Sequence, residues 1–370
     1  MLSIRINTVV IIALAALQSG CNLQTTDLSQ SLSKQLKTNA EEHGIPAQAL
    51  MIKYNQKLLY SQVHGVSDTQ TEKPVSKQDV FPVYSLSKLF ASTLVMQLVE
   101  AGELNLSDPI SKFVLNLPNA WANIRIEQLV NHTSGLPEYF ECISFECKFP
   151  ASIDLAYEQL KEAPLLFEPD TQIRYSQTNY LLIQSALENI TKKPYRDLIN
   201  NRIFKPIKME NTWLGFKDVP KSRLVTAYLA NSGDTLKENK ISFPDYAVSH
   251  ADAYSSLSDL ATFLSAMANG RLVSKPLLLD FWQPYQLSNG DTSYFATGWD
   301  YEKTGLWREL GHDGGGLVRV RLLFQKNLDN HFVIVYLTNG NEDGEWSSSL
   351  VDSMQYFIMP DLISRMATLI

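Results

Sequence analysis

A serine followed three residues later by a lysine is the first feature of this sequence that could do chemistry. Ser85-Leu86-Ser87-Lys88 has this spacing, which on a helix places the two side chains one turn apart on the same face. The lysine amine then lies beside the serine hydroxyl. The start of the helix adds partial positive charge and free NH groups that favour an alkoxide and a tetrahedral oxyanion. The pattern predicts a serine nucleophile that the lysine helps to activate.

The same tetrapeptide occurs twice in the chain, so its context has to decide between the copies. Ser31-Leu32-Ser33-Lys34 lies among charged and polar neighbours, where Lys34 would be solvated. Ser85 follows an extended aromatic stretch and opens the strongly apolar run 89–96. A helix of that composition should be buried, and burial favours the neutral, basic form of Lys88. We therefore assign the nucleophile to Ser85 and not to Ser31.

Two further stretches carry a resemblance to a known family. They are Ala101–Pro109, with the sequence AGELNLSDP, and Leu129–Pro137, with the sequence LVNHTSGLP. Together with the serine and lysine motif they resemble the class C β-lactamase, D,D-peptidase and family VIII esterase branch of the penicillin-binding-protein superfamily. The resemblance covers nearly the whole chain after the first twenty residues and implies a serine hydrolase. His132, within the second stretch, is usually structural in that family.

The family's second motif is Y-x-N, and the matching segment here begins Tyr175-Ser176-Gln177. The resemblance gives Tyr175 the role of moving a proton between the serine, Lys88 and the leaving group. A phenol titrates near pH 10, so we expect a nearby cation to lower its pKa. Gln177 departs from the family's asparagine, which puts its contacts to the substrate's acyl amide in doubt. In the alternative reading, Tyr175 is one more packed tyrosine.

The third motif is K-T-G or H-T-G on a strand, and here it reads His312-Asp313-Gly314-Gly315. The resemblance makes His312 a catalytic residue, places Asp313 and Gly314 in the substrate site, and gives Gly315 an oxyanion-hole NH beside that of Ser85. Glycine suits this position because no side chain obstructs the substrate. The alternative is a glycine-rich turn between strands. An ionised Asp313 cannot donate a hydrogen bond to a substrate carboxylate and would repel it, so we expect carboxylate-bearing β-lactams and peptides to be poor substrates. The alternatives are that Asp313 points away from the site, since side chains alternate along a strand, or that pairing with His312 neutralises it.

Residue patterns indicate which elements position these motifs. Strands are predicted near both ends of the chain: a hairpin of 49–54 and 57–64, and a cluster of 294–301, 307–311, 317–325 and 331–338. Helical patterns dominate residues 87–284, with examples at 89–101, 178–190 and 258–269, and further helices are predicted at 27–43 and 347–358. We therefore expect one α/β domain over 21–370. Its antiparallel sheet is built from both chain ends and flanked by terminal helices, with a large inserted helical subdomain.

The first twenty residues are typical of an export signal. Arg5 precedes an apolar run of roughly ten residues, too short to span a bilayer. Cys21 follows Ser19 and Gly20, as in the lipobox of bacterial lipoproteins, although Gln18 stands where that motif usually has leucine. The resemblance implies a lipid-anchored protein of the cell envelope that faces the periplasm, and Asn22 favours the outer membrane. Cleavage to a soluble periplasmic or secreted form and a retained anchor remain alternatives.

The composition of the chain limits the kinds of molecule that it is expected to bind. The formal net charge is −7 and no run of Lys or Arg occurs, which argues against nucleic acid. Cys142 and Cys147 would meet an oxidising compartment after export, where they form either a disulfide or two unpaired thiols, and their spacing is not that of a metal site. We expect no metal and no cofactor. The substrate is a small molecule or a cell-wall peptide, and the alternative to an enzyme is a penicillin-binding sensor or scaffold without turnover.

Overall fold

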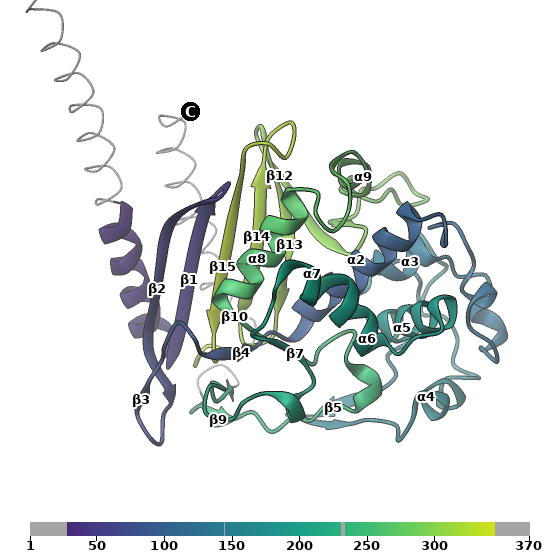
Figure 1. Cartoon of the computed structure of the whole chain (residues 1–370). Helices are drawn as coiled ribbons and strands as arrows, with labels where there is room; N and C mark the ends of the chain where they lie inside the picture. The colour runs from purple at the N-terminus through teal and green to yellow at the C-terminus, as the bar shows by residue number, and fades with distance from the viewer. Residues whose placement is uncertain (1–27, 144, 231–233, 345–370) are drawn as a thin grey trace, which may run out of the picture.

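The computed structural model describes residues 28–143, 145–230 and 234–344. An antiparallel sheet of eight strands runs through it in the order β11-β12-β13-β14-β15-β1-β2-β3 (Figure 1). The strands are β1 Ala47–Tyr54, β2 Lys57–Asp68, β3 Lys73–Pro74, β11 Phe295–Ala296, β12 Trp299–Thr304, β13 Trp307–Gly314, β14 Val318–Phe324 and β15 His331–Thr338. Strand β1 pairs with β15 along its whole length. The predicted sheet assembled from both ends of the chain is therefore confirmed.

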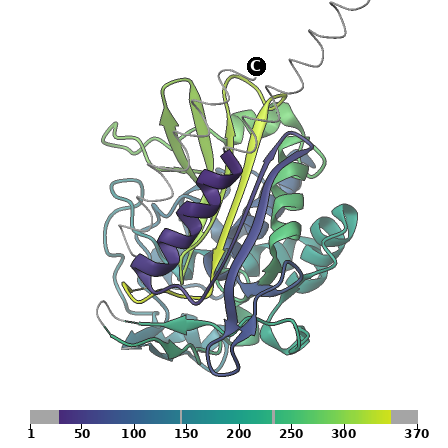
Figure 2. The same ribbon diagram turned by 90° about the vertical axis from the view of Figure 1, so that its left-hand side faces the viewer.

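A helix over residues 28–43 covers one face of this sheet (Figure 2). Leu28, Leu32 and Leu36 repeat every four residues and are buried in one apolar cluster with sheet residues such as Leu50 and Ile334. The helix is followed by Gly44, whose φ of 57° is a conformation that glycine adopts without strain. This amphipathic helix is the one that the spacing of its leucines predicted.

The helices of the inserted part lie on the other side of the sheet (Figure 1). They are α2 Ser87–Glu100, α3 Ile126–Val130, α4 Ile153–Gln159, α5 Gln177–Thr191, α6 Tyr195–Ile199, α7 Lys205–Ile207, α8 Leu257–Ala268 and α9 Lys275–Phe281. Helix α8 packs against β1, β14 and β15, and α2 packs against α5 and α6. Since α2 is enclosed on nearly all sides, a polar side chain in its first turn is removed from water.

Short elements complete the inserted part. A three-stranded sheet pairs β10 with β4 and β7, and two hairpins pair β5 with β6 and β8 with β9. Their bounds are β4 Val80–Pro82, β5 Glu141–Ile143, β6 Glu146–Lys148, β7 Thr212–Leu214, β8 Tyr228–Leu229, β9 Lys237–Glu238 and β10 Ala253–Ser256. Single helical turns are η1 Tyr84–Leu86, η2 Ile110–Lys112, η3 Asn119–Trp121, η4 Asn200–Phe204, η5 Phe216–Asp218 and η6 Asp245–Ala247.

One predicted strand was wrong. The stretch 294–301 is not continuous, because Thr297 and Gly298 both have left-handed φ angles, of 49° and 80°, and turn the chain between β11 and β12. A side chain on Gly298 would collide with the hydroxyls of Ser92 and Tyr180, so the turn also needs glycine for space. The helix expected at 347–358 and the signal segment lie outside the described residues. Within the described ranges, no helix is long and apolar enough to cross a membrane.

Candidate active site

Ser85 and Lys88 meet at the start of α2. Ser85 lies in the single turn η1, which runs directly into α2, rather than at the first residue of the α-helix itself. Lys88 Nζ is 3.2 Å from Ser85 Oγ and donates a hydrogen bond of 2.7 Å to the backbone carbonyl of His250. Lys88 is completely buried, and this burial holds its pKa well below the usual value, although Glu138 and Asp300 oppose the decrease. The amine can therefore serve as a neutral base for the serine proton.

The second copy of the tetrapeptide has none of these features. Ser31 and Lys34 are exposed on the helix 28–43, on the far side of the sheet from α2. The copy that composition favoured is thus the one that the structure places in the interior.

Tyr175 lies over the lysine, and its electrostatics differ from the expectation. Lys88 Nζ is 4.8 Å from the centre of the phenol ring. Burial raises the Tyr175 pKa well above 10, and the nearby Ser85 only partly offsets the increase. The expected decrease caused by a neighbouring cation was wrong, because Lys88 itself is driven toward its neutral form. The pair is therefore a neutral amine and a neutral phenol, and the phenol has a proton to give.

His132 supports Tyr175 from behind. Its ring centre is 4.3 Å from that of Tyr175, and its Nδ1 accepts hydrogen bonds from the backbone NH of Ser176 and from Asn179 Nδ2. These two donors place the histidine proton on Nε2. Burial holds the His132 pKa well below its usual value. His132 thus orients the segment that carries Tyr175.

The end of β13 brings the third motif to the serine. A side chain on Gly314 would come within 2.6 Å of the Val83 carbonyl oxygen and 3.4 Å of the Ser85 nitrogen, so glycine allows the strand to pass close to η1. His312 Nδ1 lies 2.6 Å from the Asp313 carbonyl oxygen, to which it donates, leaving Nε2 as an acceptor. Gly315 and Ser85 line the same cavity.

Asp313 is not an unpaired negative charge. Its carboxylate accepts two hydrogen bonds from Arg319, of 2.8 and 2.6 Å, and lies 2.9 Å from Arg321 Nη1. Burial acts to raise its pKa, but the two guanidinium groups outweigh burial and lower the pKa to about 2. The repulsion of a substrate carboxylate by Asp313 stays a prediction, and it is weakened because two arginines, rather than His312, compensate the Asp313 charge.

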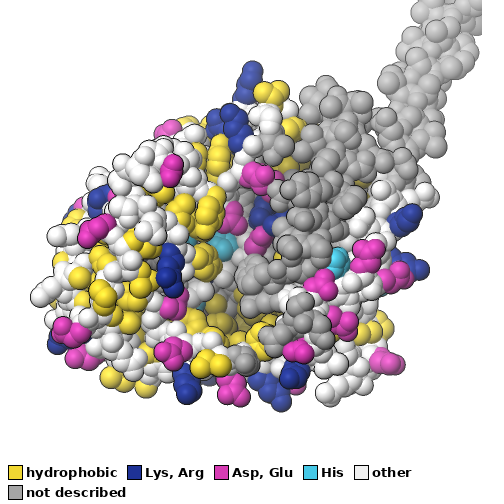
Figure 3. Space-filling model, turned by 180° about the vertical axis from the view of Figure 1, so that it is seen from behind, with side chains coloured by type: hydrophobic (Ala, Val, Ile, Leu, Met, Phe, Trp, Pro, Cys, Tyr) yellow, Lys and Arg dark blue, Asp and Glu magenta, His cyan; other side chains and the backbone are white. Residues whose placement is uncertain are grey.

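A cavity of about 720 Å³ opens over Ser85. Its walls are mainly apolar and aromatic and include Tyr84, Phe140, Phe145, Tyr175, Ile241, Phe243, Ala251, Tyr294 and Phe295. The polar residues expected in the site, Gln177, His312 and Asp313, also line it. Cys142 and Cys147 form a disulfide across the β5–β6 hairpin and contribute to the wall. The face in Figure 3 shows a hollow in which hydrophobic, acidic, basic and histidine side chains meet.

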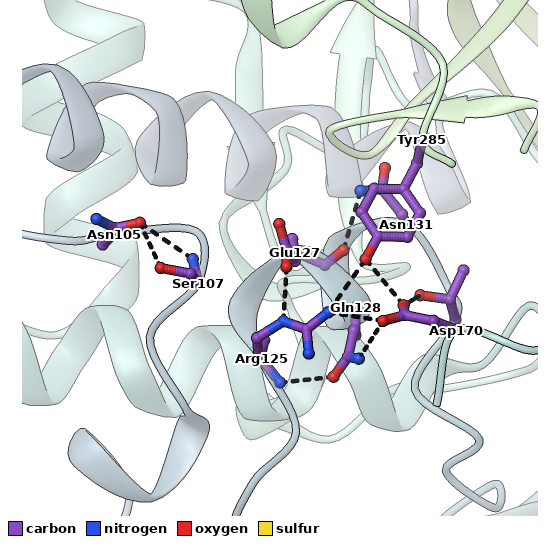
Figure 4. A network of polar contacts seen from close by, with 9 residues as sticks. Asn105, Ser107, Arg125, Glu127, Gln128, Asn131, Asp170 and Tyr285 are labelled. Carbon is purple, nitrogen blue, oxygen red and sulfur yellow. Dashed lines mark hydrogen bonds and ion pairs between the residues drawn. The ribbon is translucent and has the colours of Figure 1, made fainter. Parts of the chain in front are cut away.

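A polar network fixes the loop that leads to Tyr175. Asp170 accepts hydrogen bonds from Arg125 and Gln128 beside α3, at 2.6 and 2.7 Å, and from Tyr285 at 2.8 Å (Figure 4). Asp170 itself has a left-handed φ of 67°. The loop is therefore held at a residue five positions before Tyr175.

Sequence reasoning missed several groups that the fold brings to the site. Asp300 lines the cavity, and Glu138 accepts the backbone NH of Gln177 at the start of α5. The His250 carbonyl is a backbone group and leaves no signal in the sequence. A signal for Asp300 was its place beside an aromatic, glycine-containing turn in the strand cluster. No cluster of side chains suited to a metal ion occurs among the described residues.

Comparisons with known proteins find relatives of this chain. Among curated proteins, penicillin-binding protein 4* of Bacillus subtilis is 25% identical over 316 residues, which cover 81% of this chain and 70% of that protein. The protein flp of Staphylococcus aureus is 25% identical and covers 86% of this chain, which spans 64% of that protein's length.

Solved structures share the fold. D-amino acid amidase from Ochrobactrum anthropi SV3 superposes with a TM-score of 0.76 at 21% identity, covering 91% of this chain and 99% of the amidase. EstCE1, described as a hydrolase with promiscuous acyltransferase activity, superposes with a TM-score of 0.71 at 17% identity, covering 91% of this chain and 99% of EstCE1. The family model described as Beta-lactamase matches residues 32–348. This chain belongs to the Beta-lactamase family.

Proposed function

We propose that this protein is a serine hydrolase that cleaves esters or amides through an acyl intermediate on Ser85. The observation that carries the proposal is the buried Lys88 amine, 3.2 Å from the Ser85 hydroxyl at the floor of a large cavity. A buried amine next to a serine has little structural value, since burial of an ionisable group costs stability. It is well suited to take a proton from the serine.

The steps follow from the positions of these groups. Ser85 Oγ attacks the substrate carbonyl while Lys88 Nζ takes the hydroxyl proton. The backbone NH groups of Ser85 and Gly315 stabilise the oxyanion. Tyr175, a neutral phenol, passes a proton to the departing alcohol or amine. Water then attacks the acyl-serine, with the same groups moving protons in reverse, and releases the acid. These steps use only side-chain and backbone groups of the protein.

The family and its structural relatives support this class of reaction. The relatives include a D-amino acid amidase, a hydrolase with acyltransferase activity and a penicillin-binding protein, names that are consistent with acyl-serine chemistry. The substrate is accordingly a small ester or amide, or a cell-wall peptide. Gln177, whose side-chain oxygen is buried without a hydrogen-bond partner among the described residues, is available to a substrate amide.

The alternative is a sensor or scaffold that is acylated without turnover. Steady-state hydrolysis of a neutral p-nitrophenyl ester separates the two. We expect multiple turnovers by the wild type, a loss of at least about 10³-fold in kcat for Ser85→Ala, and wild-type rates for the matched control Ser31→Ala. A single burst without turnover would support the sensor, and equal rates in Ser85→Ala would reject the mechanism.

For the location, we propose a lipid anchor at Cys21 after cleavage of residues 1–20, with the domain facing the periplasm from the outer membrane. The support is the short apolar run followed by Ser19-Gly20-Cys21. Cys21→Ala should release the protein from membranes or block its processing in fractionated cells. Wild-type protein that is soluble after export and begins at another residue would contradict the anchor.

A further inference from the structure

The wall of the cavity contains more negative than positive charge. Of the residues that line it, Asp300 and Asp313 are acidic and none is Lys or Arg. Both belong to a charged cluster on three neighbouring strands: β12 carries Asp300, β13 carries Glu309 and Asp313, and β14 carries Arg319 and Arg321. The strand register places Asp300 and Arg321 on either side of Gly311, and Asp313 opposite Arg319. Among the described residues, three carboxylates thus share two guanidinium groups.

The arginines are engaged mainly by two of the three carboxylates. Arg319 binds Asp313 through two hydrogen bonds. Arg321 donates from Nε to Glu309 at 2.8 Å and lies 2.9 Å from Asp313. Its distance to Asp300 is 3.9 Å, at the limit of an ion pair. Asp300 is therefore the carboxylate with the weakest compensation.

Asp300 is also the member of this group that is open to a ligand. Its side chain is 27% exposed, against 12% for Glu309, and it lines the cavity over Ser85, whereas Glu309 does not. Burial raises the pKa of Asp300, and His312 and Arg321 only partly oppose the increase, because burial also lowers the pKa of His312 and of Lys88. A cationic ligand would therefore supply compensation that this carboxylate lacks. Aromatic walls reduce the screening of the remaining charge.

A second group in the same cavity is ready to accept a hydrogen bond. His312 is 4% exposed and lines the cavity, and its Nε2 has no hydrogen-bond partner among the described residues. Because Nδ1 is occupied by the Asp313 carbonyl, Nε2 presents a lone pair. A carboxylate and a neutral imidazole acceptor in one apolar cavity match an ammonium group, which offers three donors and no acceptor.

We propose that Asp300 binds a cationic amine of the substrate, with His312 Nε2 as a second acceptor. The preferred substrates are then esters or amides of acids that carry a free ammonium group and an apolar or aromatic side chain. This inference rests on the proposed hydrolase function. It also moves the discrimination against substrate carboxylates from Asp313 to Asp300, since a carboxylate at this position would meet a like charge.

The test compares substrates in which the amine is either free and charged or blocked and neutral. The methyl esters of D- and L-phenylalanine are each compared with their N-acetyl forms, which keep the aromatic ring and the leaving group. For whichever enantiomer the wild type hydrolyses faster, we expect kcat/KM to be at least tenfold higher for the free-amine ester than for its N-acetyl form. Asp300→Asn should reduce this preference at least tenfold.

Glu302→Gln is the matched control, because it removes a carboxylate from the same strand at an exposed position. It should leave the preference unchanged. A wild type without preference for the free amine, or a preference that survives Asp300→Asn, would overturn the inference.

A binding measurement separates this inference from the hydrolase proposal. Calorimetry on Ser85→Ala with phenylalaninamide and N-acetylphenylalaninamide needs no turnover. Tighter binding of the amine that is lost in Ser85→Ala/Asp300→Asn would support the role of Asp300 even if the wild type hydrolyses nothing. If Ser85→Ala binds the two amides equally while the wild type hydrolyses esters, the role of Asp300 is rejected and the hydrolase proposal stands.

Discussion

At the residue scale, the chemistry depends on keeping a basic group uncharged. Lys88 donates to a backbone carbonyl, and the carboxylates of Glu138 and Asp300 only partly oppose the decrease in its pKa that burial causes. The hydroxyl of Tyr175 is also buried and keeps its proton. The two groups therefore differ in function although both are neutral, because one accepts a proton and the other donates it.

This arrangement determines the dependence of activity on pH. A lysine is a base only above its pKa, and burial moves the Lys88 pKa down from 10.5. We expect kcat/KM for a neutral ester to rise with pH and to level off well below 10.5, with no decrease caused by Tyr175 ionisation near pH 10. Lys88→Met should lower the plateau by about 10²–10⁴-fold, whereas Lys34→Met should not change it. A pH profile in which kcat/KM rises with a midpoint at pH 10.5 or above would contradict the role of Lys88.

At the element scale, the site depends on loops held by side chains rather than on regular structure. Asp170 joins α3, the loop before α5 and the segment around Tyr285. Asp170→Asn removes the negative charge of a carboxylate that accepts hydrogen bonds from Arg125, Gln128 and Tyr285. It should lower the free energy of unfolding by about 2–3 kcal/mol and reduce kcat, because Tyr175 follows five residues later.

Urea unfolding and ester hydrolysis measure the two effects of this substitution. Asp291→Asn, at an exposed loop position, is the control and should change neither quantity. Wild-type stability together with wild-type kcat in Asp170→Asn would show that the network does not position the loop.

The β5–β6 hairpin is the second element whose order affects the site. Its disulfide closes a short loop whose tip includes Phe145, and both cysteines and Phe145 line the cavity. Replacing both cysteines with serine should lower kcat/KM for bulky aromatic esters several-fold and leave p-nitrophenyl acetate nearly unaffected, because the small ester does not reach this wall. Reductant should reproduce the effect in the wild type and add nothing in the double variant. Equal effects on both esters would contradict a role in specificity.

The sequence predicted elements whose pattern is local and missed contacts that depend on tertiary register. Helices α2, α5 and α8 have long apolar runs, and the β1–β2 hairpin has a turn at Asn55, whose φ is 51°. The pairing of Asp313 with two arginines arises only when β13 and β14 are in register. The same holds for Asp300, which needs the turn at Gly298 to reach the cavity.

At the scale of the whole molecule, the site depends on a fold that brings the two ends of the chain together in one sheet. The Ser85 segment comes early and the His312 strand comes late in the sequence, and both reach the cavity because β1 and β15 pair within one sheet. The helix 28–43 covers the outer face of that pairing and supplies Leu36, which is 1% exposed. The stability of the fold, and activity only through that stability, should therefore depend on a helix that contributes nothing to the cavity.

Truncation of Leu36 tests this dependence. Leu36→Ala leaves a cavity against the sheet and should lower the free energy of unfolding by about 2–5 kcal/mol. At temperatures where the variant is folded, kcat should be unchanged. Lys37→Ala, with a side chain that is 68% exposed, is the control and should have little effect in urea unfolding. A change of less than 1 kcal/mol for Leu36→Ala would show that the helix is not part of the cooperative fold.

The identity of the acylated residue tests the proposed mechanism most directly. Intact-mass spectrometry after reaction with an active-site-directed fluorophosphonate reports how many serines are modified and, with variants, which one. We expect a single adduct on the wild type, the same adduct on Ser31→Ala, and none on Ser85→Ala. An adduct that persists in Ser85→Ala would contradict Ser85 as the nucleophile and with it the role given to Lys88.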